Sequence, residues 1–461
     1  MAVSTFSRGL KLNPRKHATE GKPTETAPFP KQVVIPVNQH FGAPNKALVA
    51  VGDRVKRGQC IADGAADGLM TVPVHASISG TVKKIEPRLQ QNNTEGLCII
   101  IEAGEEEPKQ NDIELMPPLD PFSCPKEEAL KRIRDAGITG MGGAAFPAHV
   151  KLNPPPDKII DLIIADGAEC EPYLTTDEAV ISGKPRLLVT GLAAIMKITG
   201  VKRAIIGMED NKASLVPALE KEIALNEYIT AHSLDVTVRL CKTLYPQGGE
   251  KMLIKALANR EVPSGGLPLD SGCIVQNVGT LTAIAEAFTL GKPLVDRDLT
   301  VSGGACKTPK NICVPVGTLI GDLPETFMKI DYDRLRKIVF GGPMMGNAVP
   351  FAAVPVQKNT SGIIFLTSGE TKICDEGTCI RCGRCIRNCA CRLSPVIINI
   401  ALESGDMEEA VRAGLMDCVE CGSCSFVCPA GIKLVQRFRV GKQRLKMIKS
   451  AAQHAASQEK V

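Results

Sequence analysis

Hydrophobic and polar positions follow two different periods along the chain, and the change between them separates its first domain from the rest. From Val33 to about Ile101, short apolar runs alternate with polar residues and are separated by Gly-containing turns, as in VVIPVNQHFGAPNKALVAVGDRVKRGQC. This period of two predicts a strand-rich domain over residues 31–120. Residues 1–30 are polar and contain Pro, and we expect them to form an extended arm.

An acidic, Pro-rich linker, residues 102–121, precedes a second pattern in which strands and helices alternate. A helix capped by Ser123 and ended by Gly137 is expected first. The runs KIIDLIIADG, KRAIIGM and LDVTVRL then predict strands, and the intervening LLVTGLAAIMKITG, NKASLVPALEKEIALN and GGEKMLIKALAN predict helices. This order predicts an α/β domain with a parallel sheet over residues 121–265, whose ligands bind in loops at the carboxyl ends of the strands.

The remaining sequence predicts three further segments. Residues 266–355 are punctuated by Gly and Pro and predict a small α+β module. Residues 356–440 are Cys-rich and predicted to be mainly helical, with IINIALESGDMEEAVRAGLMD expected to form one linking helix. Residues 441–461 form a basic tail. This tail and the residues just before it predict an amphipathic helix, which either docks on its own domain or contacts a membrane surface or an acidic partner.

Charge and hydropathy narrow the functional classes. The formal net charge is +5, and residues 431–461 contribute +7 of it, so the other 430 residues carry −2. We therefore expect no nucleic-acid-binding surface on the body of the protein. No apolar run approaches the roughly 18 residues of a membrane span, so any association with a membrane is expected to depend on partners or on a surface.

The 18 cysteines are the most unusual feature of the composition, and ten of them lie between Cys374 and Cys428. The start of the chain, MAVSTFSRGLKLN, has no apolar leader, so we expect a reducing compartment and no disulfide framework. Clustered cysteines in such a chain are typical of metal or redox sites.

The spacing C-x2-C-x2-C-x3-C occurs twice in this region, at Cys379, Cys382, Cys385 and Cys389 and again at Cys418, Cys421, Cys424 and Cys428. This is the run found in bacterial two-cluster ferredoxins, in which the fourth Cys ligates the other cluster. The spacing therefore predicts two [4Fe-4S] clusters, the first held by Cys379, Cys382, Cys385 and Cys428 and the second by Cys389, Cys418, Cys421 and Cys424.

Two structural zinc sites are the alternative, because zinc also accepts four thiolates. Zinc-binding cysteines usually come as two C-x2-C pairs separated by a longer loop, so successive gaps of two residues favour the clusters. Cys391 offers a competing thiol close to Cys389, but the three-residue gap before Cys389 matches the second motif. We expect Cys374 and Cys391 to be spare buried thiols.

A glycine-rich loop, GITGMGGAAFPAHVK, carries Gly140, Gly142 and Gly143 before Lys151. Glycines allow backbone N–H groups to approach a phosphate, although the same pattern is compatible with a tight structural turn. Two more strand-to-helix junctions, ADGAECEPYLTTDE and LYPQGGEKML, add acidic residues and glycines. Three such junctions on one sheet favour a nucleotide or flavin pocket.

These motifs together resemble those of a known family. GMGGAAFPAHVK, ADGAECEP, LYPQGGEKML and VQNVGTLTAI resemble, in order, the four flavin and NADH motifs of the NADH-oxidising subunit of respiratory complex I. That subunit lacks a first domain like residues 31–120, which resembles a biotinyl/lipoyl-type barrel-sandwich, and it carries one cluster motif. A sodium-pumping quinone reductase subunit lacks the ferredoxin cysteines. The order of modules over residues 30–435 resembles the RnfC subunit of the Rnf ion-translocating electron-transport complex.

The resemblance assigns expected roles to individual residues. It implies a barrel-sandwich domain (31–120), an FMN/NADH-binding α/β domain (121–265), a β-grasp-like module (266–355) and a two-cluster ferredoxin domain (356–440). It also implies that Phe146 and Glu171 meet the nicotinamide nucleotide. The implied FMN-binding residues are Gly140, Gly142, Gly143, Lys151, Asp166, Glu169, Gly249, Glu250, Asn277 and Thr280.

The implied function is that of a peripheral subunit on the cytoplasmic face of the cell membrane, in an ion-translocating ferredoxin:NAD+ oxidoreductase. Electrons would pass between two [4Fe-4S] clusters, FMN and NAD(H). The implied partners are the membrane and iron–sulfur subunits of the same complex, and ferredoxin acts indirectly through another subunit. The alternative is a non-catalytic iron–sulfur relay adaptor with a vestigial flavin pocket.

Overall fold

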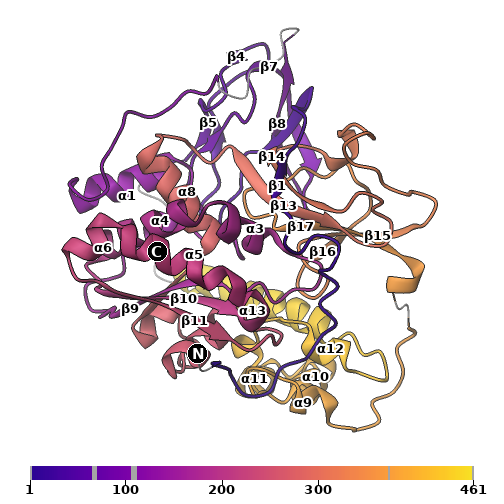
Figure 1. Cartoon of the computed structure of the whole chain (residues 1–461). Coiled ribbons are helices and arrows are strands. Elements are labelled where there is room, and N and C mark those ends of the chain that lie inside the picture. Colours follow the sequence, from indigo (N-terminus) through magenta and orange to yellow (C-terminus); the bar gives the residue numbers. More distant parts are fainter. Residues whose placement is uncertain (1–2, 65–69, 105–111, 372–373, 459–461) are drawn as a thin grey trace.

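The computed structural model describes residues 3–64, 70–104, 112–371 and 374–458, with no side-chain description for 452–458. Figure 1 shows two β-rich modules above a parallel sheet and a helical domain at the lower edge of the molecule. Each module has its own apolar core, and the domains meet through loops and through the amino-terminal arm.

The first domain is a sandwich of two small sheets, as the period of two predicts. Ile35, Ile61, Ile99 and Ile101 are fully buried between the sheets. Residues 65–69 of this domain lie outside the described residues. One sheet has the order β2 (Gln32–Pro36), β8 (Glu95–Ala103), β7 (Gly80–Leu89) and β4 (Arg54–Val55), and the other β3 (Lys46–Ala47), β5 (Cys60–Asp63) and β6 (Val74–His75).

The second domain is a four-stranded, fully parallel sheet covered by helices on both faces. Alternate side chains of its strands point to opposite faces, so Ile163 packs with one group of helices and Ile164 packs against the other face. The strand order is β11 (Asp235–Cys241), β10 (Arg203–Glu209), β9 (Leu162–Gly167) and β12 (Cys273–Asn277). The helices are α1 (Lys126–Asp135), α2 (Ala148–Lys151), α3 (Thr176–Gly183), α4 (Pro185–Thr199), α5 (Val216–Leu225), α6 (Glu227–Ala231), α7 (Glu250–Ala258) and α8 (Val278–Thr289), with 3-10 turns η2 (Asp210–Leu215) and η3 (Pro268–Ser271).

Two sequence-based expectations for this domain need correction. The boundary expected at residue 265 is too early, because β12 pairs with β9 and α8 packs on α4. The helix expected to be capped by Ser123 begins after Pro125, which has no side chain to accept a capping hydrogen bond. Its end is as predicted, since Gly137 follows it with φ of +72°, a conformation that glycine adopts without strain.

The third module is a six-stranded mixed sheet, and its extent also differs from the prediction. Apart from β1, which comes from the amino-terminal arm, its strands run from residue 296 to residue 367, so the expected limits of 266 and 355 are both wrong. Within the described residues of 296–367 the only helical turn is η4 (Ile320–Asp322), so the β-grasp-like helix is missing, and α3 packs there instead. The order is β1 (Thr24–Thr26), β14 (Lys310–Pro315), β13 (Asp296–Ser302), β17 (Gly362–Thr367), β15 (Leu335–Phe340) and β16 (Asn347–Val349), followed by the turn η5 (Ser368–Glu370).

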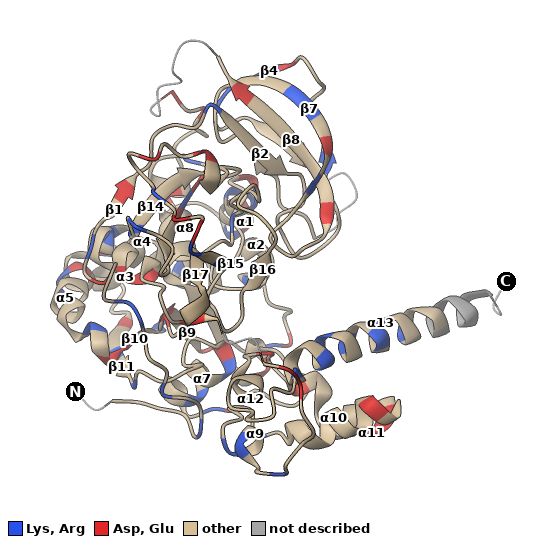
Figure 2. Ribbon diagram, turned by 90° about the vertical axis from the view of Figure 1, so that its right-hand side faces the viewer, with Lys and Arg blue, Asp and Glu red and all other residues tan. Residues whose placement is uncertain are grey.

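The carboxyl-terminal domain is mainly helical, as predicted. The single linking helix that we expected is interrupted at Gly405, whose φ is +80°, and forms two helices instead. The basic helix α13 is buried at Leu434, Val435 and Phe438 and then projects from the body, as Figure 2 shows. The helices are α9 (Arg384–Arg387), α10 (Pro395–Ser404), α11 (Met407–Arg412), α12 (Ser423–Phe426) and α13 (Leu434–Gln458), with the turn η6 (Leu415–Asp417).

The length and apolar character of the helices in the described part of the chain bear on whether any of them spans a membrane. No single one is long and apolar enough to cross a membrane. Only α3 and α4 taken together, bent by 92° at their junction, meet the criteria of length and composition.

The amino-terminal arm runs along the seam between the parallel sheet and the helical domain. Ser4 pairs with the end of β11, and Leu10 exchanges two backbone hydrogen bonds with Tyr245. Phe6 packs against Met252 of α7 and Ala390 of the helical domain. The arm is extended, as predicted, and it joins the two domains by backbone pairing and by burial of one aromatic ring.

We expect Phe6→Ala to destabilise this seam by about 3 kcal/mol, because it removes a ring that is 6% exposed from a small apolar cluster. Faster hydrogen exchange at residues 384–392 and a lower urea midpoint would report the loss. Val3→Ala is the matched control, since Val3 is 46% exposed. Unchanged exchange at 384–392 in Phe6→Ala would show that the arm does not fasten the helical domain.

Candidate functional site

The loops singled out in the sequence converge at the carboxyl ends of β9 and β12, where Asp166 and Asn277 are direct neighbours in register. The glycine-rich loop is fixed above this edge by two backbone donors. The N–H of Gly140 donates to the Phe146 carbonyl at 2.8 Å, and the N–H of Met141 donates to the Thr280 hydroxyl at 3.0 Å. Its position is thereby tied to the first turn of α8.

Two glycines of this loop have different surroundings. A Cβ on Gly142 would lie 3.1 Å from the Asn277 side chain, which is tighter than an ordinary contact, so glycine favours the close approach of the loop to the start of α8. A Cβ on Gly143 would meet no atom within 4 Å, so the backbone at Gly143 borders open space. Open backbone at a glycine-rich loop is where N–H groups can receive an anionic ligand.

Asp166, Asp177 and Asn277 form a polar group at the edge of the sheet. The Asn277 side chain caps α8 by accepting from the N–H of Gly279 and donates through Nδ2 to Asp177 at 3.0 Å. Burial raises the pKa of Asp166 well above its usual range, and the neighbouring charge of Asp177 raises it further. A buried carboxyl group of this kind can accept or donate a hydrogen bond to a ligand hydroxyl.

Glu169 belongs to a buried ionic network that the sequence did not reveal. Its carboxylate lies 3.3 Å from Lys212 and 4.0 Å from Lys16, and it accepts from the N–H of Asp177 at 3.0 Å. Both carboxylate oxygens of Glu209, close to the same lysines, are buried without a hydrogen-bond partner. Lys16 comes from the arm and Lys212 from η2, so no local motif could have identified either.

Glu171 faces the third module. Its two oxygens accept from the backbone N–H groups of Met344 (3.0 Å) and Met345 (2.8 Å), in the turn between β15 and β16. Burial raises the pKa of Glu171 to about 7. The carboxylate therefore holds a neighbouring loop in place in this structure, beside the nucleotide contact that the resemblance implies.

Glu171 should give the protein a pH-dependent stability. Because its folded pKa of about 7 lies above its ordinary value of 4.5, the free energy of unfolding should fall as the pH rises from about 4.5 through 7, by about 3 kcal/mol. Glu171→Gln should flatten this decline in urea unfolding measured at pH 5 and pH 8. Glu95→Gln, at an exposed position, is the control. Equal pH dependence in all three proteins would contradict the assignment.

The third junction places Gly249 at the amino-terminal cap of α7 and Glu250 at its first residue. Lys151 forms an ion pair with Glu250 and donates to the Val275 carbonyl, so its ammonium group bridges α2, α7 and β12. Both polar atoms of the buried Gln247 side chain have no hydrogen-bond partner. These unpartnered polar atoms, next in sequence to Gly248 and Gly249, fit a polar ligand at this junction.

Phe146 stacks on Phe41 of the barrel-sandwich domain, with ring centroids 6.0 Å apart. The N–H of Phe41 also donates to the Ala145 carbonyl, so the segment QHFGAP touches the glycine-rich loop. Phe41 is 54% exposed and its ring is therefore accessible at this junction. The sequence singled out this segment as a module marker, and its contact with the loop became visible only in the fold.

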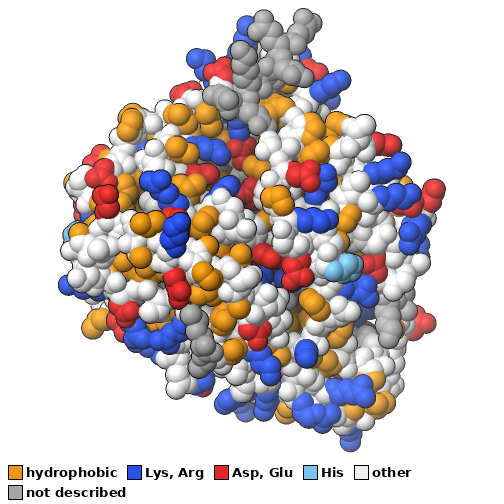
Figure 3. Space-filling view, viewed as in Figure 1, with side chains coloured by type: hydrophobic (Ala, Val, Ile, Leu, Met, Phe, Trp, Pro, Cys, Tyr) orange, Lys and Arg blue, Asp and Glu red, His pale blue; other side chains and the backbone are white. Residues whose placement is uncertain are grey.

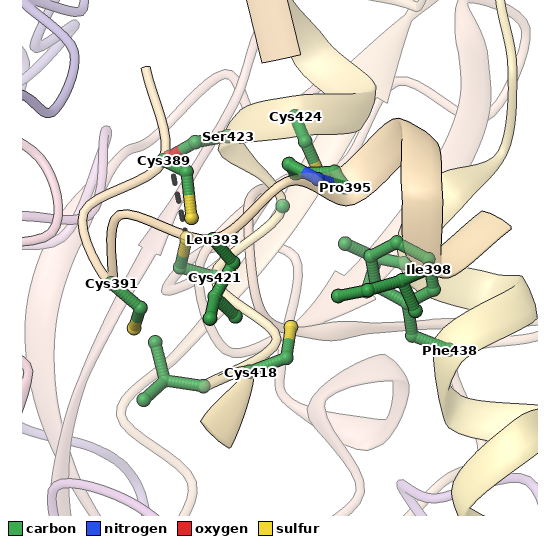
Figure 4. A pocket seen from close by; sticks show the side chains of 13 residues that line it. Cys389, Cys391, Leu393, Pro395, Ile398, Cys418, Cys421, Ser423, Cys424 and Phe438 are labelled. Atoms are coloured by element: carbon green, nitrogen blue, oxygen red, sulfur yellow. Dashed lines mark hydrogen bonds between the residues drawn. The ribbon is translucent and has the colours of Figure 1, made fainter. Parts of the chain in front are cut away.

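The second cysteine motif surrounds a cavity in the helical domain, shown in Figure 4. Cys389 of the first motif lies with Cys418, Cys421 and Cys424, which is the grouping that the ferredoxin spacing predicts. Burial raises the pKa of the Cys418 thiol to about 11. The other lining residues are mostly apolar, among them Leu393, Pro395, Ile398, Val435 and Phe438.

Cys391 also lines this cavity, but in Figure 4 its sulfur points away from those of Cys389 and Cys421. Burial raises the pKa of Cys391 to about 12. Cys374 is exposed, so our expectation of a buried spare thiol is wrong there. All 18 cysteines are free thiols in this structure.

The two motifs have the same backbone conformation. Arg381 and Glu420, at equivalent positions, both have a φ of +56°, and Gly383 and Gly422 follow with φ of +69° and +80°. Each motif then enters a four-residue helix, α9 or α12, and these two helices pack together. The duplication in the sequence is therefore a duplication in structure.

The spacing of the cysteine side chains distinguishes a site for one metal ion from a site for a cluster. Among the described residues, no three His, Cys, Asp or Glu side chains are close enough to share one ion. A four-iron cube binds each thiolate through a different iron, so its ligands stand farther apart than those of one ion. Four thiols around an apolar cavity fit such a cube in the chemistry of the donors.

Comparison with known families agrees with this architecture. Residues 4–106 match the RnfC barrel sandwich hybrid domain, and residues 133–286 match the Nuo51 FMN-binding domain. Fold and sequence thus define a multidomain α/β protein of the flavin-dependent electron-transfer class. The chain belongs to the RnfC family, the C subunits of the ion-translocating ferredoxin:NAD(+) oxidoreductase complexes.

Its relatives are similar over most of their length. The chain is 42% identical to the C subunit of a proton-translocating ferredoxin:NAD(+) oxidoreductase complex from Clostridium ljungdahlii, covering 95% of this chain and 93% of the relative. It is 39% identical to the C subunit of the Na(+)-translocating complex from Acetobacterium woodii, covering 96% and 97%. A solved NAD+-reducing [NiFe]-hydrogenase in the air-oxidized state aligns with a TM-score of 0.48, at 19% identity over 64% of this chain and 55% of that chain.

Proposed function

We propose that this chain transfers electrons between NAD(H), an FMN and two [4Fe-4S] clusters, as the peripheral subunit of an ion-translocating ferredoxin:NAD+ oxidoreductase. The names of its relatives and the match to an FMN-binding domain support this function. Its partners are the membrane and iron–sulfur subunits of the same complex, and ferredoxin supplies electrons through one of them. It acts on the cytoplasmic face of the cell membrane.

The crevice at the carboxyl ends of β9 and β12 is the proposed FMN site. When bound, FMN would supply the chemistry of accepting a hydride from NADH and releasing electrons singly, which suits a protein that joins a two-electron donor to one-electron carriers. Gly143 presents open backbone to the phosphate, whereas the N–H of Gly140 is engaged by the Phe146 carbonyl and shapes the loop. Thr280 and Asn277 hold the loop against α8. Asp166 and Glu250 provide carboxyl groups for the remaining polar contacts, and Phe146 provides a ring against which a nicotinamide can stack.

Three of the proposed ligands act differently from what the resemblance implies. Glu169 pairs with Lys212, and Glu171 accepts hydrogen bonds from backbone N–H groups of the third module. In this proposal both side chains therefore hold the ADGAECEP loop in position and do not contact the ligand. Lys151 is held by Glu250 and Val275, and it contributes positive charge to the crevice instead of a direct phosphate contact.

We assign the two clusters to the cysteine sets predicted from the sequence, in which the fourth Cys of each motif ligates the cluster of the other motif. Cys389, Cys418, Cys421 and Cys424 hold the cluster nearer the flavin, and Cys379, Cys382, Cys385 and Cys428 hold the outer one. The single observation that carries this order is the hydrogen bond from the Tyr245 hydroxyl to the Cys421 carbonyl. Tyr245 belongs to the third flavin motif. Its buried side chain therefore brings that motif into contact with a proposed cluster ligand.

A second contact supports the same order. A Cβ on Gly422 would lie 2.8 Å from the carbonyl oxygen of Met344, so the second cysteine motif packs closely on that turn. The N–H of Met344 is held in turn by Glu171 of the second flavin motif. Two flavin motifs thus reach the inner cysteine set, one through Tyr245 and the other through this turn.

We expect Tyr245→Phe to slow the reduction of the inner cluster by NADH several-fold, while flavin content and NADH-dependent dye reduction stay near the wild-type values. The change removes the donor to the Cys421 carbonyl and leaves the ring in place. Stopped-flow absorbance under anaerobic conditions separates flavin bleaching from cluster reduction. Tyr332→Phe, at an exposed tyrosine, is the control. Unchanged cluster reduction would contradict the contact's role.

The alternative function is a non-catalytic relay between two iron–sulfur partners, with a vestigial flavin pocket. Anaerobic reconstitution followed by quantitation of flavin, iron and acid-labile sulfide, together with NADH-dependent dye reduction, separates the two. Stoichiometric FMN and NADH-dependent dye reduction support the oxidoreductase. Full iron and sulfide with neither FMN nor dye reduction would establish the relay adaptor, and zinc without sulfide would remove the clusters from both accounts.

A further inference from the structure

The two cysteine motifs have the same backbone but opposite surroundings. In the second motif Glu420 forms ion pairs with Arg439 (3.0 Å) and Lys442 (2.8 Å), and Ser423 is 1% exposed. In the first motif the equivalent positions are Arg381 and Arg384, and both are exposed. One copy of the repeat is therefore packed against the protein, and the other faces solvent.

Three arginines alternate with the cysteines on this outward face, which we call the arginine face: Arg381, Arg384 and Arg387. All three side chains are exposed, and none has a carboxylate partner among the described residues. Ile380 between them is 67% exposed, and Cys379 is exposed as well. One ligand of the proposed outer cluster, Cys379, is thus exposed inside a group of unpaired positive charges, and the other three are partly exposed.

Neighbouring segments strengthen this charge. Arg392 and Arg8 lie at its edge, where Arg392 donates to the Ser7 hydroxyl and Arg8 donates to the Ile386 carbonyl, so neither is neutralised. Of the nearby acids, Glu376 is paired with Arg437. Asp375 remains as an exposed carboxylate.

The pictures show the same distribution. In Figure 2 the ribbon is coloured for Lys or Arg on α9 and on the loop below it. Figure 3 shows Lys and Arg along the lower edge of the molecule, where Figure 1 places α9, α10 and α11.

We propose that the arginine face is the docking surface for an acidic iron–sulfur protein that exchanges electrons with this chain. The inference rests on the proposed function, because it needs an outer cluster at Cys379, Cys382, Cys385 and Cys428. At each encounter the reduced partner loses one electron and this chain gains one, with no bond made or broken. The positive charge steers an acidic partner to the one edge where cluster ligands are exposed.

The test is equilibrium binding of an acidic two-cluster ferredoxin, used as a probe, to the reconstituted full-length chain at low and at high salt. The triple variant R381Q/R384Q/R387Q should bind it about tenfold or more weakly at low salt, with a smaller salt dependence than the wild type. The matched control is R444Q/K446Q/K449Q, which removes the same charge from exposed positions of α13. A basic c-type cytochrome is the probe of opposite charge.

The proposal is supported if R381Q/R384Q/R387Q loses ferredoxin binding and R444Q/K446Q/K449Q does not. The α13 variant should also bind the basic cytochrome no better than the wild type does. Equal loss in both variants would overturn it, since net charge would then explain the binding. Loss in the α13 variant alone would overturn it and assign the acidic partner to the basic tail. Iron, sulfide, FMN and NADH-dependent dye reduction are measured on each protein, so a failure of the proposed function is seen in the wild type, independently of binding.

Discussion

Cys389→Ser will remove about half of the iron and acid-labile sulfide from the reconstituted chain, whereas Cys391→Ser will leave both unchanged. Both thiols border the same cavity, but only Cys389 has the three-residue gap shared with the second motif, and the Cys391 sulfur points away from its neighbours. The pair of variants is a matched test, since each exchanges one sulfur for one oxygen two residues apart. The reverse result would make Cys391 the ligand.

The same two variants separate the steps of electron transfer. Cys389→Ser should retain NADH-dependent dye reduction at the flavin and lose the reduction of the remaining outer cluster by NADH, because in the proposed order the inner cluster stands between the flavin and the outer one. If NADH still reduced the remaining cluster at the wild-type rate, the order of the clusters proposed from the Tyr245 contact would be wrong.

Gly143→Asp should lower the affinity for FMN by two orders of magnitude or more. The position has room for a side chain, so the change should leave the fold intact, but it sets a carboxylate beside the proposed phosphate. Two like charges about 4 Å apart near a protein surface repel by about 4 kcal/mol. The neutral Gly143→Asn, of nearly the same size, is the control and should retain most of the flavin.

Flavin content after dialysis against buffer, and the dissociation constant from fluorescence quenching, measure this effect. Equal flavin loss in both variants would indicate a steric cause, and equal retention would remove the glycine-rich loop from the phosphate site. Gly142 is unsuitable for the test, because a side chain there would collide with Asn277 and disturb the loop directly.

Local patterns in the sequence predicted the parts of the structure that depend on local physics. The strands β9, β10 and β11, the helices α4 and α7, and the end of α1 at Gly137 follow from apolar periodicity and glycine chemistry. The repeated cysteine spacing predicted both the grouping of Cys389 with the second motif and the helical character of the domain. These features were recognisable because each is encoded within one short stretch of sequence.

Features that depend on distant segments could not be predicted in this way. The pairing of β12 with β9 and of β17 with β13 joins stretches that are remote in the sequence, so the domain limits at 265 and 355 were misplaced. Lys16 and Lys212 reach Glu169 from the arm and from η2, and Phe41 reaches Phe146 from another domain. Such tertiary contacts have no short-range signal, because burial of charge is decided by the fold.

The arrangement explains how one chain can join two kinds of electron carrier. The parallel sheet places the proposed flavin site at its carboxyl edge, and the third proposed flavin motif extends from that edge to Cys421, a proposed cluster ligand, through Tyr245. The arm then fastens the helical domain against the sheet. A short, rigid connection between carriers is what single-electron transfer through protein requires.

The measurement that tests this account most directly is low-temperature electron paramagnetic resonance of the anaerobic, reconstituted chain before and after addition of NADH. The account predicts that NADH bleaches the flavin absorbance and produces signals of reduced [4Fe-4S] clusters in the same sample. Full complements of FMN, iron and sulfide with no cluster signal after NADH, although dithionite still reduces the clusters, would contradict electron transfer between the flavin and the clusters of this chain.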